Sequence, residues 1–272
     1  MKTILITGCS SGIGLASAKA AAARGWRVLA TARKPDDLSR LASLGLEPLP
    51  LELRDPASVA ACAATALERA GGRLDALFNN AAHGQPGAVE DLSVELLRDQ
   101  FEVNLFAWHA LTRPILAAMR KAGGGRIVNC SSVLGLISPP YRGAYNATKF
   151  ALEALSEAMR HELAGTNISV SLIEPGPIGT NFVATALELF RANIDIEASA
   201  HREVYHRRLA GMAAGGRQTF KLPPEAVAAK LIHAIESPRP KAHYYVTVPT
   251  YLADIGRRLL PQRLADLMVR GA

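Results

Sequence analysis

The chain has 272 residues, of which 49% are hydrophobic and 20% are charged, so it can bury a large core within one domain spanning residues 1–272. Its three cysteines lack CxxC or metal-ligand spacing, which argues against a disulfide framework, predicts no metal site and favours the reducing cytoplasm. The net charge of +7 is scattered without an aromatic-and-basic stripe, so no nucleic-acid partner is expected, and no apolar run approaches a membrane span.

Short β-branched runs alternate with longer stretches of helical spacing along the chain. The predicted strands cover residues 3–7, 27–31, 47–51, 74–79, 126–131, 168–173 and 244–248. The helical stretches between them include residues 13–24, 56–70, 93–121 and 144–164. This alternation predicts the α/β class, with a Rossmann-type, doubly wound parallel sheet of about seven strands and helices on both faces. Ligands of such a sheet bind in a crevice at the carboxyl ends of its strands.

A glycine-rich loop joins the first predicted strand to the first predicted helix. It reads Thr7-Gly8-Cys9-Ser10-Ser11-Gly12-Ile13-Gly14, a GxxxGxG arrangement. Glycines permit a tight turn and let backbone amides approach a pyrophosphate at the positive helix N-terminus. We therefore expect a dinucleotide to contact this loop, and a Gly/Ser-rich loop without a ligand is the alternative. The predicted contact residues are Gly8, Ser10, Ser11, Gly12, Ile13 and Gly14.

The second predicted strand ends in Thr31-Ala32-Arg33-Lys34, where an NAD-binding protein usually has an acidic residue. A carboxylate would repel a 2′-phosphate, whereas a guanidinium binds it through paired, charge-assisted hydrogen bonds. Arg33 and Lys34 thus favour NADP(H), and an ordinary basic pair on the surface is the alternative reading.

Tyr145 and Lys149 are four residues apart, which places them one turn apart on one face of a helix. A free phenol with a pKa near ~10 is too weak a base at neutral pH, and a neighbouring ammonium group lowers that pKa. Upstream, the fifth predicted strand ends at Ser131 and Ser132, where a hydroxyl can hold a substrate oxygen. A Tyr–Lys pair alone occurs often by chance, so the prediction depends on its coexistence with the glycine loop, the serines and the basic strand end.

Residues 181–222 interrupt the alternation before the last predicted strand. This stretch is mainly helical, contains the basic pair Arg207–Arg208, and has Gly211, Gly215 and Gly216 near its end. Its position predicts a helical lid over the substrate, and a simple packing excursion is the alternative. The expected pocket wall, from both sides of the crevice, comprises Val133, Leu134, Leu136, Ile137, Pro139, Pro140, Tyr141, Phe182, Val183, Leu187, Leu189 and Phe190.

Residues 250–272 form a predicted C-terminal helical extension. Leu252, Ile255, Leu259 and Leu264 recur at helical spacing around Pro261. The extension could pack on the body, join subunits or rest on a membrane surface. Packing or subunit contact is favoured over the membrane, and the sequence does not separate the first two.

These features together resemble the short-chain dehydrogenase/reductase family over most of the chain. Asn79-Asn80-Ala81-Ala82 is similar to the family's NNAG segment, and Pro175 to Thr180 is similar to its PGxVxT loop. Two departures are Ala82 in place of glycine and Glu52 where many members have an aspartate near the adenine. Ala82 should be tolerated if its backbone angles are ordinary, and the Glu52 contact stays open.

The resemblance implies roles for individual residues. Ser132 positions the substrate, Tyr145 donates the proton, Lys149 binds the ribose, and the backbone of Asn104 helps to hold a water that connects to the lysine. The cofactor-binding residues that the resemblance adds or reuses are Leu53, Asn80, Ala81, Tyr145, Lys149, Pro175, Gly176, Ile178 and Thr180.

Within the family, Thr7–Leu15, Arg33–Asp37, Leu172–Ile178 and Arg257–Asp266 look like bacterial NADP-dependent aldehyde reductases, with hydroxysteroid and retinol dehydrogenases as related branches. We therefore expect NADPH-dependent reduction of an apolar aldehyde or ketone, such as a fatty aldehyde. A hydroxysteroid or retinol dehydrogenase is one alternative. A non-catalytic NADP(H) sensor is another, although it would be expected to have lost the tyrosine or lysine. The resemblance also implies a homodimer or homotetramer.

Overall fold

A computed structural model describes residues 1–213 and 219–270. Gly215 and Gly216, predicted near the end of the lid, lie outside the described residues. The strands are β1 (Thr3–Ile6), β2 (Arg27–Ala32), β3 (Glu47–Pro50), β4 (Ala76–Asn79), β5 (Gly125–Cys130), β6 (Ile168–Glu174) and β7 (His243–Tyr245). The α-helices are α1 (Gly12–Ala23), α2 (Pro35–Ser43), α3 (Pro56–Arg69), α4 (Val94–Phe101), α5 (Ala107–Lys121), α6 (Gly143–Glu162), α7 (Phe182–Asn193), α8 (Arg202–Ala213), α9 (Glu225–Glu236), α10 (Val248–Leu259) and α11 (Gln262–Arg270).

The seven strands form one sheet in the order β3-β2-β1-β4-β5-β6-β7, and every neighbouring pair is parallel. All four residues of β1 are buried, as expected for a strand covered on both faces. The chain reverses direction across the sheet between β3 and β4, which places the carboxyl ends of β1 and β4 at the switch point. The predicted doubly wound fold is confirmed.

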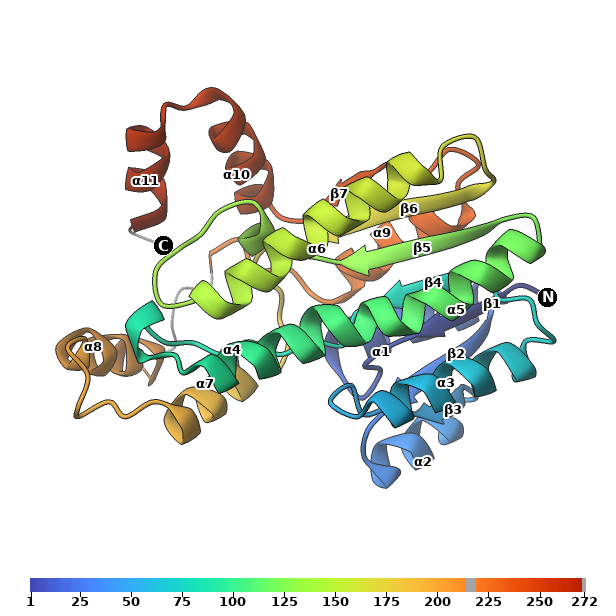
Figure 1. Cartoon of the computed structure of the whole chain (residues 1–272), viewed down its shortest axis with the longest axis horizontal. Coiled ribbons are helices and arrows are strands. Elements are labelled where there is room, and N and C mark those ends of the chain that lie inside the picture. Colours follow the sequence, from blue (N-terminus) through green and yellow to red (C-terminus); the bar gives the residue numbers. More distant parts are fainter. Residues whose placement is uncertain (214–218, 271–272) are drawn as a thin grey trace.

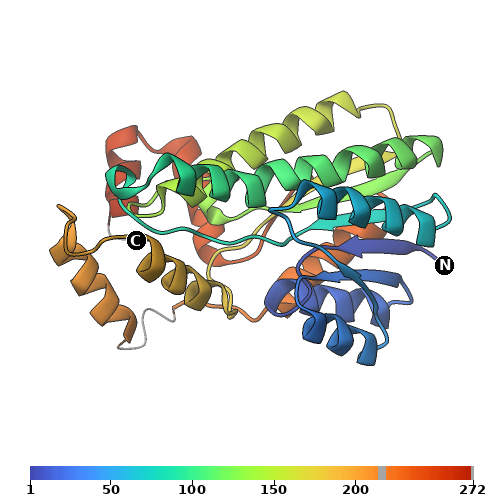
Figure 2. The same ribbon diagram turned by 60° about the horizontal axis from the view of Figure 1, so that its bottom comes forward.

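Helices cover both faces of the sheet. Helix α1 packs against α9 on one face, while α3 packs against α5 and α6 packs on β6 on the other. Figure 2 shows the two layers with the strands between them. Trp108 of α5 and Phe78 of β4 are among the largest fully buried side chains of the main apolar core. The core thus fixes the strand ends that carry the site.

Two predicted elements differ from the structure. The helix expected over 93–121 divides into α4, a π-helical turn over Glu102–Phe106, and α5. The strand expected over 244–248 ends at Tyr245, because Pro249 in the first turn of α10 favours a helix start at Val248. The short β7 is fixed to β6 through Glu174, whose side chain pairs with the His243 Nδ1 at 2.6 Å.

Four additional helices lie beyond the carboxyl ends of the strands. Helices α7 and α8, from the predicted lid, and α10 and α11, from the predicted extension, all lie toward the side to which β4 and β5 point (Figure 1). Several apolar side chains of the last two helices are exposed, namely Leu252, Ile255, Leu259, Leu264 and Leu267. Among the described residues, no helix is both long enough and apolar enough to cross a membrane.

Candidate active site

The glycine loop follows β1 and is locked against the end of β4. The Thr7 hydroxyl accepts hydrogen bonds from the backbone N–H groups of Asn80 and Ala81, at 2.8 and 3.0 Å. Gly8 has φ +72°, and a Cβ there would lie 2.8 Å from the Cα of Ala81. A Cβ on Gly14 would lie 2.1 Å from the Gly8 carbonyl oxygen. Only glycine therefore permits this packing, in which the loop lies at the N-terminus of α1.

The loop has the features of a phosphate cradle. Ser11 is the N-cap residue of α1, yet its side chain makes no capping hydrogen bond. The first amides of α1 and this hydroxyl are consistent with an anionic ligand held by the helix N-terminus. A dinucleotide pyrophosphate fits this donor set. Leu53, another predicted cofactor contact, is buried within the main apolar core.

Basic residues gather at the end of β2. Arg33 and Lys34 are exposed there, and Arg33 Nη1 lies 3.6 Å from Glu52 Oε2. Sequence reasoning missed Arg40 of α2, which donates a hydrogen bond to the Ser10 carbonyl of the glycine loop. Arg40 lies 30 residues after Ser10 in the sequence, so no local motif indicated this contact. The acidic first turn of α2 indicated only that Arg40 lies on an exposed face of that helix. The region around the end of β2 can therefore present two guanidinium groups, those of Arg33 and Arg40, to an anion.

Tyr145 and Lys149 lie on α6, as predicted. Lys149 Nζ donates to the Cys130 carbonyl oxygen at 2.8 Å and lies 4.6 Å from the centre of the Trp108 ring. It is 5.5 Å from the centre of the Tyr145 ring. Burial lowers the pKa of Lys149 to about 8. The ammonium group thus stays close to the phenol in a largely dehydrated environment.

The predicted lowering of the Tyr145 pKa is wrong for this chain by itself. Burial is the largest effect and raises the pKa of the phenol, and the nearby Cys130 thiol raises that pKa further. The Ser132 side chain and the Arg142 guanidinium oppose this effect. A phenol with a raised pKa stays protonated at neutral pH, so Tyr145 is held in the form that donates a proton.

Asn104 lies in the π-helical turn between α4 and α5. Its side chain bonds both backbone groups of His83, with Oδ1 accepting the N–H at 3.1 Å and Nδ2 donating to the carbonyl at 2.8 Å. Nδ2 also lies 3.4 Å from the hydroxyl of Thr148, the residue before Lys149. π-helical turns frequently occur at functional sites because they interrupt regular helical hydrogen bonding. The side chain thus fixes the segment after β4 to α6.

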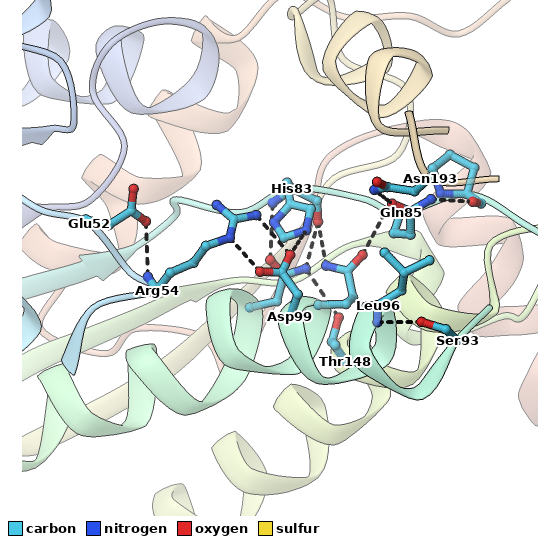
Figure 3. A network of polar contacts seen from close by, with 12 residues as sticks. Glu52, Arg54, His83, Gln85, Ser93, Leu96, Asp99, Thr148 and Asn193 are labelled. Atoms are coloured by element: carbon cyan, nitrogen blue, oxygen red, sulfur yellow. Dashed lines mark hydrogen bonds and ion pairs between the residues drawn. The ribbon is translucent and has the colours of Figure 1, made fainter. Parts of the chain in front are cut away.

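The same polar network reaches both ends of the crevice. Arg54 pairs with Asp99 at 2.5 Å, and Asp99 Oδ2 lies 3.2 Å from His83 Nε2. At the other end, Asn193 of α7 donates to the Gln85 side chain at 2.8 Å (Figure 3). The residues from Arg54 to the lid helix are therefore joined through the segment that follows β4.

The predicted nicotinamide loop follows β6. A Cβ on Gly176 would lie 2.0 Å from Thr247 Oγ1, so only glycine fits there. The Pro175 carbonyl accepts a hydrogen bond from Val133 at 2.8 Å, and Ile178 forms an isolated bridge with Leu222. A Cβ on Gly12 would lie 3.0 Å from the Thr180 side chain. The loop therefore lies between the glycine loop and the predicted lid.

The NNAG-like segment tolerates its alanine. Among the described residues, Ala82 is not one of the non-glycine positions with positive φ, which are Tyr141 and Phe220. The backbone angles of Ala82 are therefore ordinary, which is the condition under which alanine was expected to replace the glycine of the NNAG pattern.

A cavity of about 410 Å³ opens beside Tyr145. The Phe182 ring of α7 is 5.3 Å from the Tyr145 ring, centre to centre. Of the predicted wall, the lining includes Leu134, Tyr141, Phe182, Val183, Leu187 and Phe190, but not Val133, Leu136, Ile137, Pro139, Pro140 or Leu189. Sequence reasoning missed the lining contributions of Gly84, Gln85, Pro86, Gly87, Arg142, Ala186, Tyr205, Arg208, Leu209 and Gly211.

A family model described as short chain dehydrogenase matches residues 2–188. The uncharacterized oxidoreductase YbbO of Escherichia coli is 43% identical, covering 99% of this chain and 94% of that protein. Human 17-beta-hydroxysteroid dehydrogenase type 1 is 34% identical, covering 90% of this chain and 77% of its own. The NADPH-dependent 3-dehydrocapnine reductase of Ornithobacterium rhinotracheale is 30% identical, covering 98% and 95% respectively.

Solved structures with the same fold include proteins with either nicotinamide dinucleotide. A short-chain dehydrogenase from Streptomyces avermitilis has a TM-score of 0.78 and 32% identity, covering 98% of this chain and 94% of that one. An actinorhodin polyketide ketoreductase with NADPH has a TM-score of 0.73 and 30% identity, covering 90% and 95%. A Burkholderia phymatum protein in complex with NAD has a TM-score of 0.77 and 28% identity, covering 100% and 96%.

Proposed function

Since this chain belongs to the short-chain dehydrogenase/reductase family, we propose that it reduces an apolar aldehyde or ketone to the alcohol with NADPH. The observation that carries the proposal is a mainly apolar cavity whose wall includes the Tyr145 phenol, with Lys149 held beside it. An apolar wall binds the body of the substrate, and the protonated phenol supplies the acid that carbonyl reduction requires.

Each catalytic side chain has its own role in the proposed reaction. When bound, NADPH supplies the hydride to the carbonyl carbon. Ser132 and Tyr145 donate hydrogen bonds to the carbonyl oxygen, and Tyr145 then gives its proton to the forming alkoxide. Lys149 binds the ribose hydroxyls and stabilises the resulting phenolate. Asn104 holds the segment beside the lysine, where a water returns the proton. The protein contributes orientation and electrostatics, and the reverse reaction uses Tyr145 as the base.

Charge at the end of β2 supports NADPH rather than NADH. Arg33, Lys34 and Arg40 supply cationic groups, and no carboxylate directly follows the strand. Glu52 pairs with Arg33 and Asp37 pairs with Arg40, so a 2′-phosphate would have to compete with these two pairs. That competition is favourable for a dianionic ligand, because its charge-assisted hydrogen bonds are stronger than an exposed ion pair.

A hydroxysteroid substrate is the second candidate. The relation to human 17-beta-hydroxysteroid dehydrogenase type 1 supports it, as does a cavity of about 410 Å³ with a mainly apolar lining. Buried free thiols at Cys9, Cys62 and Cys130 support a cytoplasmic location. Exposed Phe106 and Phe150, at the end of the π-helical turn and on α6, support a homodimer or homotetramer.

The test is NADPH consumption by the purified chain with a panel of apolar aldehydes, ketones and steroids. Tyr145→Phe, which removes only the hydroxyl, is expected to lower kcat by about 100- to 10,000-fold while NADPH binding persists. Tyr251→Phe is the matched control, because that tyrosine is exposed on α10. Full activity of Tyr145→Phe would refute the assigned proton donor. Tight NADPH binding by the wild type without turnover of any substrate would favour a sensor.

A further inference from the structure

Two arginines line the otherwise mainly apolar cavity. Arg142 immediately precedes α6, three residues before Tyr145, and Arg208 lies on α8 of the predicted lid. They approach the cavity from opposite sides of the crevice, one from the body and one from the lid. No aspartate or glutamate is among the described residues that line this cavity.

Neither arginine has a carboxylate partner among the described residues. Two acids that contact the segment around α8 are engaged with other groups: Glu90 pairs with His201, and Asp91 accepts hydrogen bonds from Ser199 and Tyr205. The pKa of Arg142 is lowered by burial and by the charge of Arg208. Arg142 is exposed and Arg208 is half-buried, so the cost of this arrangement is the repulsion between two neighbouring cations, which an anion bound between them would remove.

A purely structural role does not account for the pair. Arg208 lies 4.6 Å from the centre of the Tyr141 ring, and this cation–π contact helps to pack α8. Arg142, by contrast, is the N-cap residue of α6, makes no capping hydrogen bond, and has no acidic residue in the following turn. A cation at a helix N-terminus opposes the helix dipole. The position of Arg142 is therefore unfavourable for the helix and suited to an anion in the cavity.

The backbone next to Arg142 is also constrained. Tyr141 has φ +66°, an uncommon value for a bulky residue, and its carbonyl accepts a hydrogen bond from the Gly87 N–H at 3.0 Å. Such strain persists only where surrounding contacts hold it, and it is concentrated at functional sites. The turn carries Tyr141 onto Arg208 and places Arg142 at the cavity wall.

We infer that Arg142 and Arg208 bind an anionic group of the substrate, so that the physiological substrate is an oxo compound with an apolar chain and an oxyanion headgroup. The inference rests on the proposed reductase function and narrows its substrate class. Carboxylate, sulfonate and phosphate share the planar or tripodal oxygens that guanidinium forks bind in pairs. The apolar chain lies along the lid side chains, and the headgroup lies close to the reacting carbonyl because Arg142 is on the same helix start as Tyr145.

The test compares medium-chain 2-oxo and 4-oxo acids, each with its methyl ester, as substrates for the full chain with NADPH. The readout is the ratio of kcat/KM for the acid to that for its ester. Wild type is expected to prefer at least one acid, and Arg208→Gln and Arg142→Gln each to lower that ratio by about 10- to 100-fold. Arg207→Gln is the matched control, because Arg207 lies on the same helix outside the cavity lining. NADPH fluorescence checks that each variant still binds the cofactor.

The outcomes separate this inference from the function on which it rests. Equal ratios in wild type, Arg208→Gln and Arg142→Gln would overturn the anion site and leave the reductase intact. If neither acids nor esters are reduced, the reductase function fails, and calorimetry with the same compounds decides the anion site. Binding of an acid that is lost in Arg208→Gln would support the site. Equal binding of acid and ester by wild type would overturn it.

Discussion

Glu153→Gln is expected to stabilise the protein at neutral and alkaline pH. Glu153 lies two turns after Tyr145 on α6, is almost fully buried, and its Oε1 has no hydrogen-bond partner among the described residues. Burial and the charge of Glu174 together raise the pKa of Glu153 from 4.5 to about 7, while the Ser131 side chain and the charge of His243 oppose them. At a pH between 4.5 and about 7, Glu153 is therefore protonated in the folded state and ionised in the unfolded state.

The sign follows from this raised pKa. Stability that is fully present below 4.5 is lost as the pH rises toward about 7, and the interval corresponds to about 3 kcal/mol of unfolding free energy at about 1.4 kcal/mol per pKa unit. Glutamine has the shape of the protonated acid but no charge to bury. Its variant should match wild type near pH 4 and exceed it above pH 7 by as much as this amount, which is about 5–10 °C in Tm.

Chemical denaturation of both proteins over a range of pH measures this difference directly. Glu162→Gln is the matched control, because Glu162 is exposed at the far end of the same helix. Parallel stability curves for wild type and Glu153→Gln across the range would show that the carboxylate is not destabilised by its surroundings. The burial argument would then be refuted.

Two further predictions concern the cofactor site. Gly14→Ala places a methyl group 2.1 Å from the Gly8 carbonyl oxygen, so the loop must shift; we expect a loss of about 1–3 kcal/mol and at least tenfold weaker NADPH binding, measured by denaturation and fluorescence titration. Gly25→Ala is its control for steric crowding, because nothing lies within 4 Å of a Cβ there, although its own φ of +80° costs some stability. Arg33→Asp should lower the preference for NADPH over NADH by about 10- to 100-fold in kinetic assays, and an unchanged preference would mean that other residues bind the 2′-phosphate.

Local patterns were sufficient to predict the sheet and the strand-end residues. The glycine loop, the Tyr145–Lys149 spacing and the serines after β5 each depend on a few neighbouring residues, so their placement follows from the chain alone. The π-helical turn around Asn104 was not predictable in this way, because the flanking sequence has continuous helical periodicity. The turn carries Asn104, whose side chain contacts His83, 21 residues earlier in the sequence.

The substrate side of the site was harder to predict. Arg208 belongs to a basic pair of the predicted lid to which the sequence assigned no role, and only the packing of α8 brings it to Tyr141. Lys149 was expected to lower the Tyr145 pKa, but spacing carries no information about how much water the fold removes. Desolvation is a property of the assembled tertiary structure, and here it outweighs the Ser132 side chain and the Arg142 charge, which lower the pKa of Tyr145.

The contact of Gly176 with Thr247 has a consequence for the order in which the protein is made. All the proposed catalytic side chains lie between Asn104 and Lys149, and a growing polypeptide exposes them early. The loop that faces them is held by Leu222 and Thr247, which are synthesised well after Lys149. A nascent chain that stops before β7 would therefore carry every proposed catalytic side chain without the contact that holds the predicted nicotinamide loop, so catalytic competence would arrive only after Thr247 is made.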